Sequence, residues 1–89
     1  MNALPCSTLE QVYLVERDAG LMCRILGLYA SRGLDVVRAE YAHAAQDVMS
    51  LKIGVARGRD DRAETARVLV DKASTLVGVI AAADVPEMP

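Results

Sequence analysis

The 89-residue sequence contains no tryptophan and no phenylalanine, and its only aromatic side chains are three tyrosines. Surfaces that stack nucleic-acid bases need several aromatic rings, so this composition argues against an RNA-recognition module. The net charge is −2 and basic residues are scattered, which also argues against a patch that binds phosphate backbones. We therefore expect no nucleic-acid partner.

Cysteine and histidine are scarce as well. Cys6 and Cys23 match no C-x-x-C spacing, so reduced thiols are favoured over a disulfide or a metal site. Cys23 is expected to be a small core residue rather than a ligand. The single histidine, His43, has no nucleophile beside it in the sequence and is expected in a solvated turn. The sequence predicts no catalytic residues, no metal and no cofactor.

Long apolar runs are also absent. No stretch approaches the roughly 20 apolar residues of a membrane span, and no charged leader precedes an apolar segment. We expect a cytoplasmic protein with no membrane partner. Apolar residues nevertheless make up 53% of the chain and are mostly aliphatic, which predicts one small domain with apolar surface available for a subunit interface. The expected boundaries are a lead-in over 1–7, a folded domain over 8–85 and a tail over 86–89.

Hydrophobic periodicity predicts six elements, over residues 8–16 (strand), 18–32 (helix), 34–42 (strand), 48–56 (strand), 61–73 (helix) and 77–85 (strand). With right-handed crossovers, this βαββαβ order predicts an α+β fold, the ferredoxin-like sandwich. Its four-stranded antiparallel sheet carries both helices on one face, in the strand order 4-1-3-2. The second strand is then an exposed edge, which needs covering or pairing.

Individual positions within these elements have specific expectations. Asp18 is expected to cap the first helix, and Gly33 to take the left-handed conformation that follows its end. Strict alternation in the second strand puts Val36 on the same face as Arg38 and Glu40.

Gly20 lies in the first turn of the first helix, where alanine would be about 1 kcal/mol more favourable. Two explanations are open. The glycine permits either close packing of the helix on the sheet, or the approach of a ligand to the helix N-terminus, where amides predicted to be free favour a carboxylate.

The stretch Arg17-Asp-Ala-Gly-Leu21, followed after the helix by Arg32-Gly-Leu-Asp-Val36, resembles the ACT domain family. It is most similar to the small regulatory subunits of acetolactate synthase, over nearly the whole chain. The resemblance implies that a small amino acid binds at the first corner and at the start of the second strand. The candidate binding residues are Arg17, Asp18, Ala19, Gly20, Leu21, Asp35 and Val36.

Two of these residues depart from the family pattern, because Arg17 and Asp35 stand where it has asparagine. Arg17 is able to pair with a carboxylate and Asp35 to accept a hydrogen bond from an α-ammonium group.

The resemblance further implies a non-catalytic regulatory subunit, in branched-chain amino acid biosynthesis, that forms a homodimer through its second strand. Its expected partner is the thiamine-diphosphate-dependent acetolactate synthase large subunit. Because the sequence ends at residue 89, it looks like the short, single-domain type of small subunit. The alternative is a stand-alone dimeric ACT interaction module, without a ligand or in another amino-acid pathway.

Overall fold

A computed structural model describes residues 8–56 and 62–85. Along the chain it contains β1 (Thr8–Glu16), α1 (Ala19–Ser31), β2 (Val36–Ala45), β3 (Val48–Ala56), α2 (Arg62–Ala73) and β4 (Val79–Val85). The predicted lead-in over 1–7 and tail over 86–89 lie outside the described residues.

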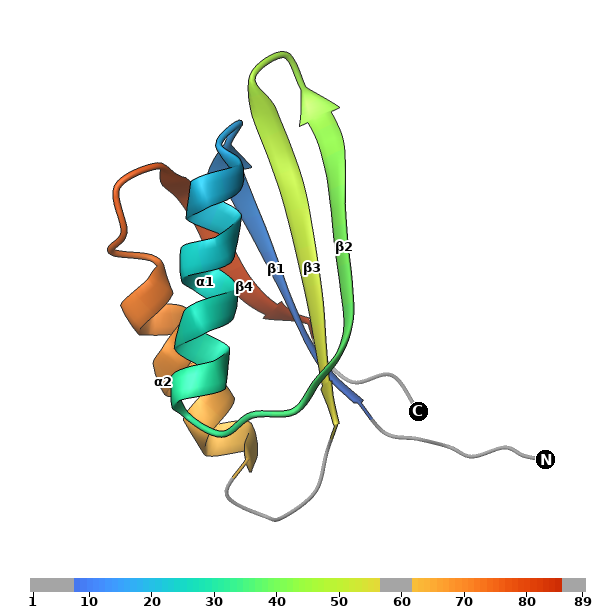
Figure 1. Ribbon diagram of the computed structural model, residues 1–89, viewed down its shortest axis with the longest axis vertical. Coiled ribbons are helices and arrows are strands. Elements are labelled where there is room, and N and C mark those ends of the chain that lie inside the picture. The colour runs from blue at the N-terminus through green and yellow to red at the C-terminus, as the bar shows by residue number, and fades with distance from the viewer. Residues whose placement is uncertain (1–7, 57–61, 86–89) are drawn as a thin grey trace, which may run out of the picture.

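The strands form one antiparallel sheet in the order β2-β3-β1-β4, and both helices cover the same face of it (Figure 1). This is the predicted ferredoxin-like sandwich, with β1 and β3 in the centre and β2 and β4 at the edges. Because β1 and β2 both pair antiparallel to β3, they run in the same direction, and α1 carries the chain back between them. The two ends of α1 therefore lie at opposite ends of the sheet (Figure 1).

β2 differs from its prediction at both ends. It extends to Ala45, so His43 lies within the strand and not in a turn; the imidazole Nε2 is 2.6 Å from the carbonyl oxygen of Gln46. At the other end a bulge breaks the alternation, because Val36 pairs with Val55 whereas Arg38 pairs with Gly54. The prediction that Val36 shares a face with Arg38 is therefore wrong, since Val36 lies on the face covered by the helices.

β4 begins later than predicted because Gly78 turns the chain immediately before it. The φ angle of Gly78 is +100°, a conformation that residues with a side chain rarely adopt. A Cβ at this position would lie 2.8 Å from Cδ2 of Leu21, so the turn also packs tightly against the start of α1. Val77, predicted to begin the strand, lies in this turn and is 90% exposed.

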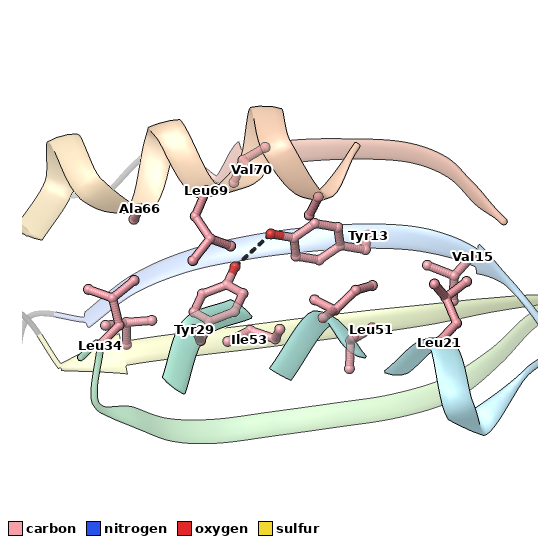
Figure 2. Close-up of a cluster of buried hydrophobic side chains, with 13 residues drawn as sticks. Tyr13, Val15, Leu21, Tyr29, Leu34, Leu51, Ile53, Ala66, Leu69 and Val70 are labelled. Carbon is pink, nitrogen blue, oxygen red and sulfur yellow. Dashed lines mark hydrogen bonds between the residues drawn. The ribbon is translucent and has the colours of Figure 1, made fainter. Parts of the chain in front are cut away.

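The core lies between the helices and the sheet and is aliphatic apart from two tyrosines (Figure 2). Its fully buried members are the central parts of β1 and β3 with the inner faces of α1 and α2; the larger ones are Tyr13, Val15, Leu21, Ile25, Tyr29, Leu51, Ile53, Val55 and Leu69. Cys23 is exposed with a free thiol, so its prediction as a core residue is wrong. It follows Met22 on α1, on the side turned away from the sheet.

A chain of hydrogen bonds between side chains crosses this core, and the donor and the acceptor of each bond can be assigned. Tyr29 donates its hydroxyl hydrogen to Gln11 Oε1 at 2.9 Å, so Tyr13 must donate in the 2.7 Å contact between the two hydroxyl groups (Figure 2). Gln11 Nε2 in turn donates to Asp84 Oδ1 at 3.1 Å. We call Tyr13, Tyr29, Gln11 and Asp84 the polar relay. It joins α1 to β1 and β4.

Burial has a clear electrostatic effect on the two tyrosines. Removal from water raises the pKa of Tyr13 to about 12, since the tyrosinate form loses its solvation. Burial also raises the pKa of Tyr29, and its hydrogen bond with Tyr13 raises it further. Both hydroxyl groups therefore remain protonated at neutral pH, as the relay requires.

Candidate functional site at the β1–α1 corner

The candidate site is built on the turn between β1 and α1. Asp18 has an extended conformation, with φ −156°, and its carboxylate accepts a 2.9 Å hydrogen bond from the Gly20 amide. Its carbonyl oxygen accepts a 3.0 Å hydrogen bond from the Leu21 amide. Asp18 is thus the N-cap of α1, as predicted. At the other end of the helix, Gly33 has a φ of +70°, also as predicted.

The caps leave less of the helix N-terminus available than the sequence suggested. Asp18 accepts hydrogen bonds from the amides of both Gly20 and Leu21, so these two amides are not available to a ligand carboxylate. Within the described part of the chain, the amide of Ala19 has no hydrogen-bond partner. Leu21 contributes only backbone to the corner, because its side chain is buried in the core.

Gly20 is not needed for packing of α1 on the sheet. The residue is exposed, and a Cβ placed on it would contact only the carboxylate oxygen of Asp18, at 3.2 Å. The explanation that Gly20 permits close helix–sheet packing is therefore wrong. Of the two explanations, approach of a ligand to this backbone is the one that the local geometry leaves open.

Two neighbouring turns hold the corner in place. The amide of Arg17 donates to the carbonyl oxygen of Asp47 in the β2–β3 turn, at 3.0 Å. On the other side, the amide of Glu16 donates to the carbonyl oxygen of Gly78, at 2.9 Å. The Arg17 guanidinium approaches the Asp47 carboxylate only to 4.0 Å, and both side chains are largely exposed. The backbone of the corner is thus fixed, while the arginine side chain is held only weakly.

The other predicted binding residues lie far from this corner within one chain. Asp35 and Val36 come after α1, whereas Asp18 comes before it, and a helix of 13 residues is about 20 Å long. The carbonyl oxygen of Asp35 accepts a 2.9 Å hydrogen bond from the Ala56 amide, which fixes it at the far end of the sheet. The structure therefore brings together residues 17–21 but not Asp35 and Val36. Helix length alone predicts this separation.

The described residues hold no further obvious chemical centre. In residues 8–56 and 62–85, no three side chains of histidine, cysteine, aspartate or glutamate come together as a metal site would require. Neither α1 nor α2 combines the length and the apolar character needed to cross a membrane.

Comparison with solved structures identifies the fold. The C-terminal domain of the MgtC protein from Mycobacterium tuberculosis superposes with a TM-score of 0.75 and 14% identity, covering 96% of this chain and 92% of that one. The ACT domain from GTP pyrophosphokinase of Chlorobium tepidum gives a TM-score of 0.70 and 12% identity, with 91% and 100% covered. The acetolactate synthase small subunit from Thermotoga maritima gives 0.71 and 23%, with 93% and 50% covered.

These likenesses establish that the chain has an ACT-like ferredoxin fold. It spans half the length of the acetolactate synthase small subunit. No model of a known protein family and no curated protein sequence matches it. Since one fold serves many functions, the function has to be argued from the corner and from the exposed strand edge.

Proposed function

We propose that the chain is a non-catalytic regulatory ACT domain that forms a homodimer and binds a small amino acid between its two copies. The observation that carries this proposal is the separation of the candidate site into halves at opposite ends of α1. One chain cannot close such a site around a small ligand. Two chains related by a two-fold axis can, with residues 17–21 from one copy and residues 35 and 36 from the other.

The outer edge of β2 supports pairing with a second copy. β2 is a ten-residue edge strand without proline, and nearly all of its residues are exposed. A long bare edge is a template for another strand. Antiparallel pairing of β2 with its copy reverses the second chain, so Asp35 of the copy moves to the end of the sheet that carries Asp18. Pairing of the two β2 strands would then also complete the amino-acid site.

A strip of half-buried apolar side chains lies beside that edge on the helix side. Met22 and Leu26 each follow a buried residue of α1 by one position, so they lie on the flank of the helix beside its buried face. The side of α1 away from α2 is turned toward β3 and β2 (Figure 1). Tyr41 on β2 and Met49 on β3 are on the face of the sheet that the helices cover. All of them pack against the core yet keep some solvent exposure. A second copy paired at β2 would bring its own α1 flank over the same strip, which gives the dimer an apolar layer behind its strand pairing.

The corner offers partners for both ends of an amino acid. Arg17 is a candidate for the ligand carboxylate, because its guanidinium is exposed and only weakly held by Asp47. The unpaired Ala19 amide is a second donor to that carboxylate. Asp35 of the second copy would accept hydrogen bonds from the α-ammonium group. Gly20 puts no side chain over this backbone, and the only atom near its Cβ position is Asp18 Oδ1, at 3.2 Å.

Calorimetric titration with valine, leucine, isoleucine and serine tests the ligand. At least one of them is expected to bind the wild-type chain, and Gly20→Asp to abolish that binding through bulk and negative charge beside Asp18. Gly27→Asp is the matched control, since Gly27 is an exposed glycine of the same helix with nothing within 4 Å of its Cβ position. Circular dichroism verifies that both variants keep α1. Equal affinity in wild type and Gly20→Asp would remove this corner from the site.

A mixed dimer tests whether the halves come from different chains. Gly20→Asp and Asp35→Ala are each expected to lose binding as homodimers. A heterodimer of the two variants has one site with both changes and one site with neither, so half of the binding capacity should return. If both halves belonged to the same chain, the mixture would bind nothing. The experiment uses two differently tagged chains that are refolded together and purified through both tags.

The more specific role is that of an acetolactate synthase small subunit. It is supported by the shared fold and by the 23% identity over 93% of this chain. The purified chain is expected to bind a thiamine-diphosphate-dependent acetolactate synthase large subunit and to change its rate of acetolactate formation, with no synthase activity alone. If neither a complex nor a rate change is found, the stand-alone ACT module remains. If no amino acid binds either, that module acts without a ligand.

A further inference from the structure

A pair of opposite charges lies on the free edge of β2. Arg38 and Glu40 project from the face of the sheet that the helices leave open, and the guanidinium of Arg38 hydrogen-bonds Glu40 Oε2 through Nη2 at 2.9 Å and Nε at 3.1 Å. Their side chains are 61% and 47% exposed. They stand on either side of Ala39, within the bulge-free stretch of β2 that runs from Arg38 to His43.

The side chain of Arg38 lies close to the sheet because its neighbour on β3 is a glycine. Gly54 is its neighbour on β3, and a Cβ there would lie 3.3 Å from Cβ of Arg38. The absent side chain lets Arg38 reach toward β1, where its guanidinium is 3.8 Å from Glu10. Lys52 lies directly opposite Glu40 on β3. Within one chain, Arg38 is therefore paired with Glu40 beside it and approaches Glu10 across the sheet.

Charge selects among the ways in which two copies of this edge can pair. In a two-fold antiparallel pair, residues equally far from the central residue on opposite sides face one another across the strands. A pair centred on Arg38 sets two arginines opposite each other, and one centred on Glu40 sets two glutamates opposite each other. Both are unfavourable, since like charges directly opposite are destabilising.

A pair centred on Ala39 has the reverse effect. Arg38 of each chain then faces Glu40 of the other, so two favourable cross-strand pairs form on the open face. On the helix side, the same centre brings Val37, which is 54% exposed, toward Tyr41 of the second copy. A centre at Tyr41 leaves both charges opposite alanines. The alternation of charge along β2 thus matches one register only.

We propose that two copies of this chain pair their β2 strands about Ala39, with reciprocal Arg38–Glu40 contacts that fix the register. This inference rests on the proposed edge dimer and gives it a defined arrangement. The four charges form a closed ring on the open face of an eight-stranded sheet. The partner that fits this edge is a second copy of the same chain, because a strand with the same spacing of positive and negative charge supplies the complement.

Charge reversal tests the register by light scattering and sedimentation over a range of protomer concentrations. Arg38→Glu sets glutamates at both positions, and Glu40→Arg sets arginines at both. Each single variant is expected to dimerise at least tenfold more weakly than wild type. An equimolar mixture of the two should form a heterodimer of near wild-type affinity, and the double variant R38E/E40R should recover as a homodimer. Arg67→Glu is the matched control, as it breaks an exposed ion pair with Glu64 on α2.

The possible failures have different meanings. A wild-type chain that stays monomeric at high micromolar concentration overturns the edge dimer and the register together. A wild-type dimer that persists in both single variants overturns the register and leaves dimerisation through another surface. The register is also overturned if both single variants dimerise weakly and their equimolar mixture does not form a tight heterodimer. The loss of affinity would then come from the changed net charge and not from the pairing of Arg38 with Glu40. Circular dichroism of every variant separates these results from failure to fold.

Discussion

The polar relay makes an asymmetric prediction for two tyrosines that are equally buried. In Tyr29→Phe, Gln11 Oε1 loses its donor and the Tyr13 hydroxyl loses its acceptor, so two buried polar groups are left unpaired. Each costs about 1–3 kcal/mol, and we expect a loss of about 3 kcal/mol in the free energy of unfolding. In Tyr13→Phe, Tyr29 still donates to Gln11 and loses only a hydrogen bond that it accepts. That loss should be about 1 kcal/mol.

Urea unfolding followed by far-UV circular dichroism measures these differences. All variants are compared at one protomer concentration, since the proposed dimerisation would add to the apparent stability. Tyr41→Phe is the control, because the Tyr41 hydroxyl makes no hydrogen bond to the described residues and its removal should change stability by less than about 0.5 kcal/mol. Total stability is only about 5–15 kcal/mol for such domains, so Tyr29→Phe remains measurable but is clearly weakened.

The double variant completes the thermodynamic cycle. Removing both hydroxyl groups leaves only Gln11 Oε1 without its donor, so the combined loss should be smaller than the sum of the single losses by about 1–2 kcal/mol. Equal losses for the two single variants, or a larger one for Tyr13→Phe, would refute the direction of the relay. Strict additivity would refute the contact between the two hydroxyl groups.

Three further changes follow from the same structure. The pKa of Tyr13 is raised to about 12 in the folded chain and that of Tyr29 is also raised, so as the pH increases the unfolded chain loses these two protons before the folded chain does. The free energy of unfolding should therefore be level below about pH 10 and fall above it. Urea titrations at several pH values should show a fall of up to about 1.4 kcal/mol per pH unit for each tyrosine. Gly78→Ala should lower the thermal midpoint sharply, because its φ is +100° and its Cβ would clash with Leu21. Asp18→Ala should cost about 1 kcal/mol in urea and Asp18→Asn much less, since asparagine keeps the cap.

Much of the fold follows from the sequence because its strongest patterns are local. The bounds of β1 and β3 match the predictions. In β3 the alternation of apolar and polar residues is uninterrupted, and β1 is marked by a run of β-branched and aromatic residues. The topology follows from element order and crossover handedness. The bulge between Val36 and Arg38 could not be predicted from the sequence. A bulge inserts one extra residue into the strand and so moves Val36 to the other face of the sheet, but no residue type marks where this happens. The predicted start of β4 was too early, because Val77 and Val79 are both typical strand residues. Gly78 between them forms a turn, and the strand begins only after it.

The buried polar residues and the layout of the site were harder to predict. Gln11 shares the face of β1 that carries Tyr13 and Val15, and it is 1% exposed because Tyr29 from α1 and Asp84 from β4 satisfy its polar atoms. Neither partner is near it in the sequence. At the corner, the Asp18 cap was predictable from local chemistry. Its occupation of the Gly20 and Leu21 amides depends on the conformation of one turn, which residue types do not determine.

In the proposed dimer, α1 has a role that neither end of it reveals alone. Its N-terminus carries residues 17–21 of one site, and its C-terminus leads through Gly33 to Asp35 of the other site. Each helix thus connects two sites about 20 Å apart, and a tilt of α1 changes both of them. The polar relay fixes that tilt, because Tyr29 ties the last turns of α1 to β1, and Gln11 ties β1 to β4. Since binding requires two chains, ligand and assembly stabilise one another by the same factor, and the small core gains stability from both.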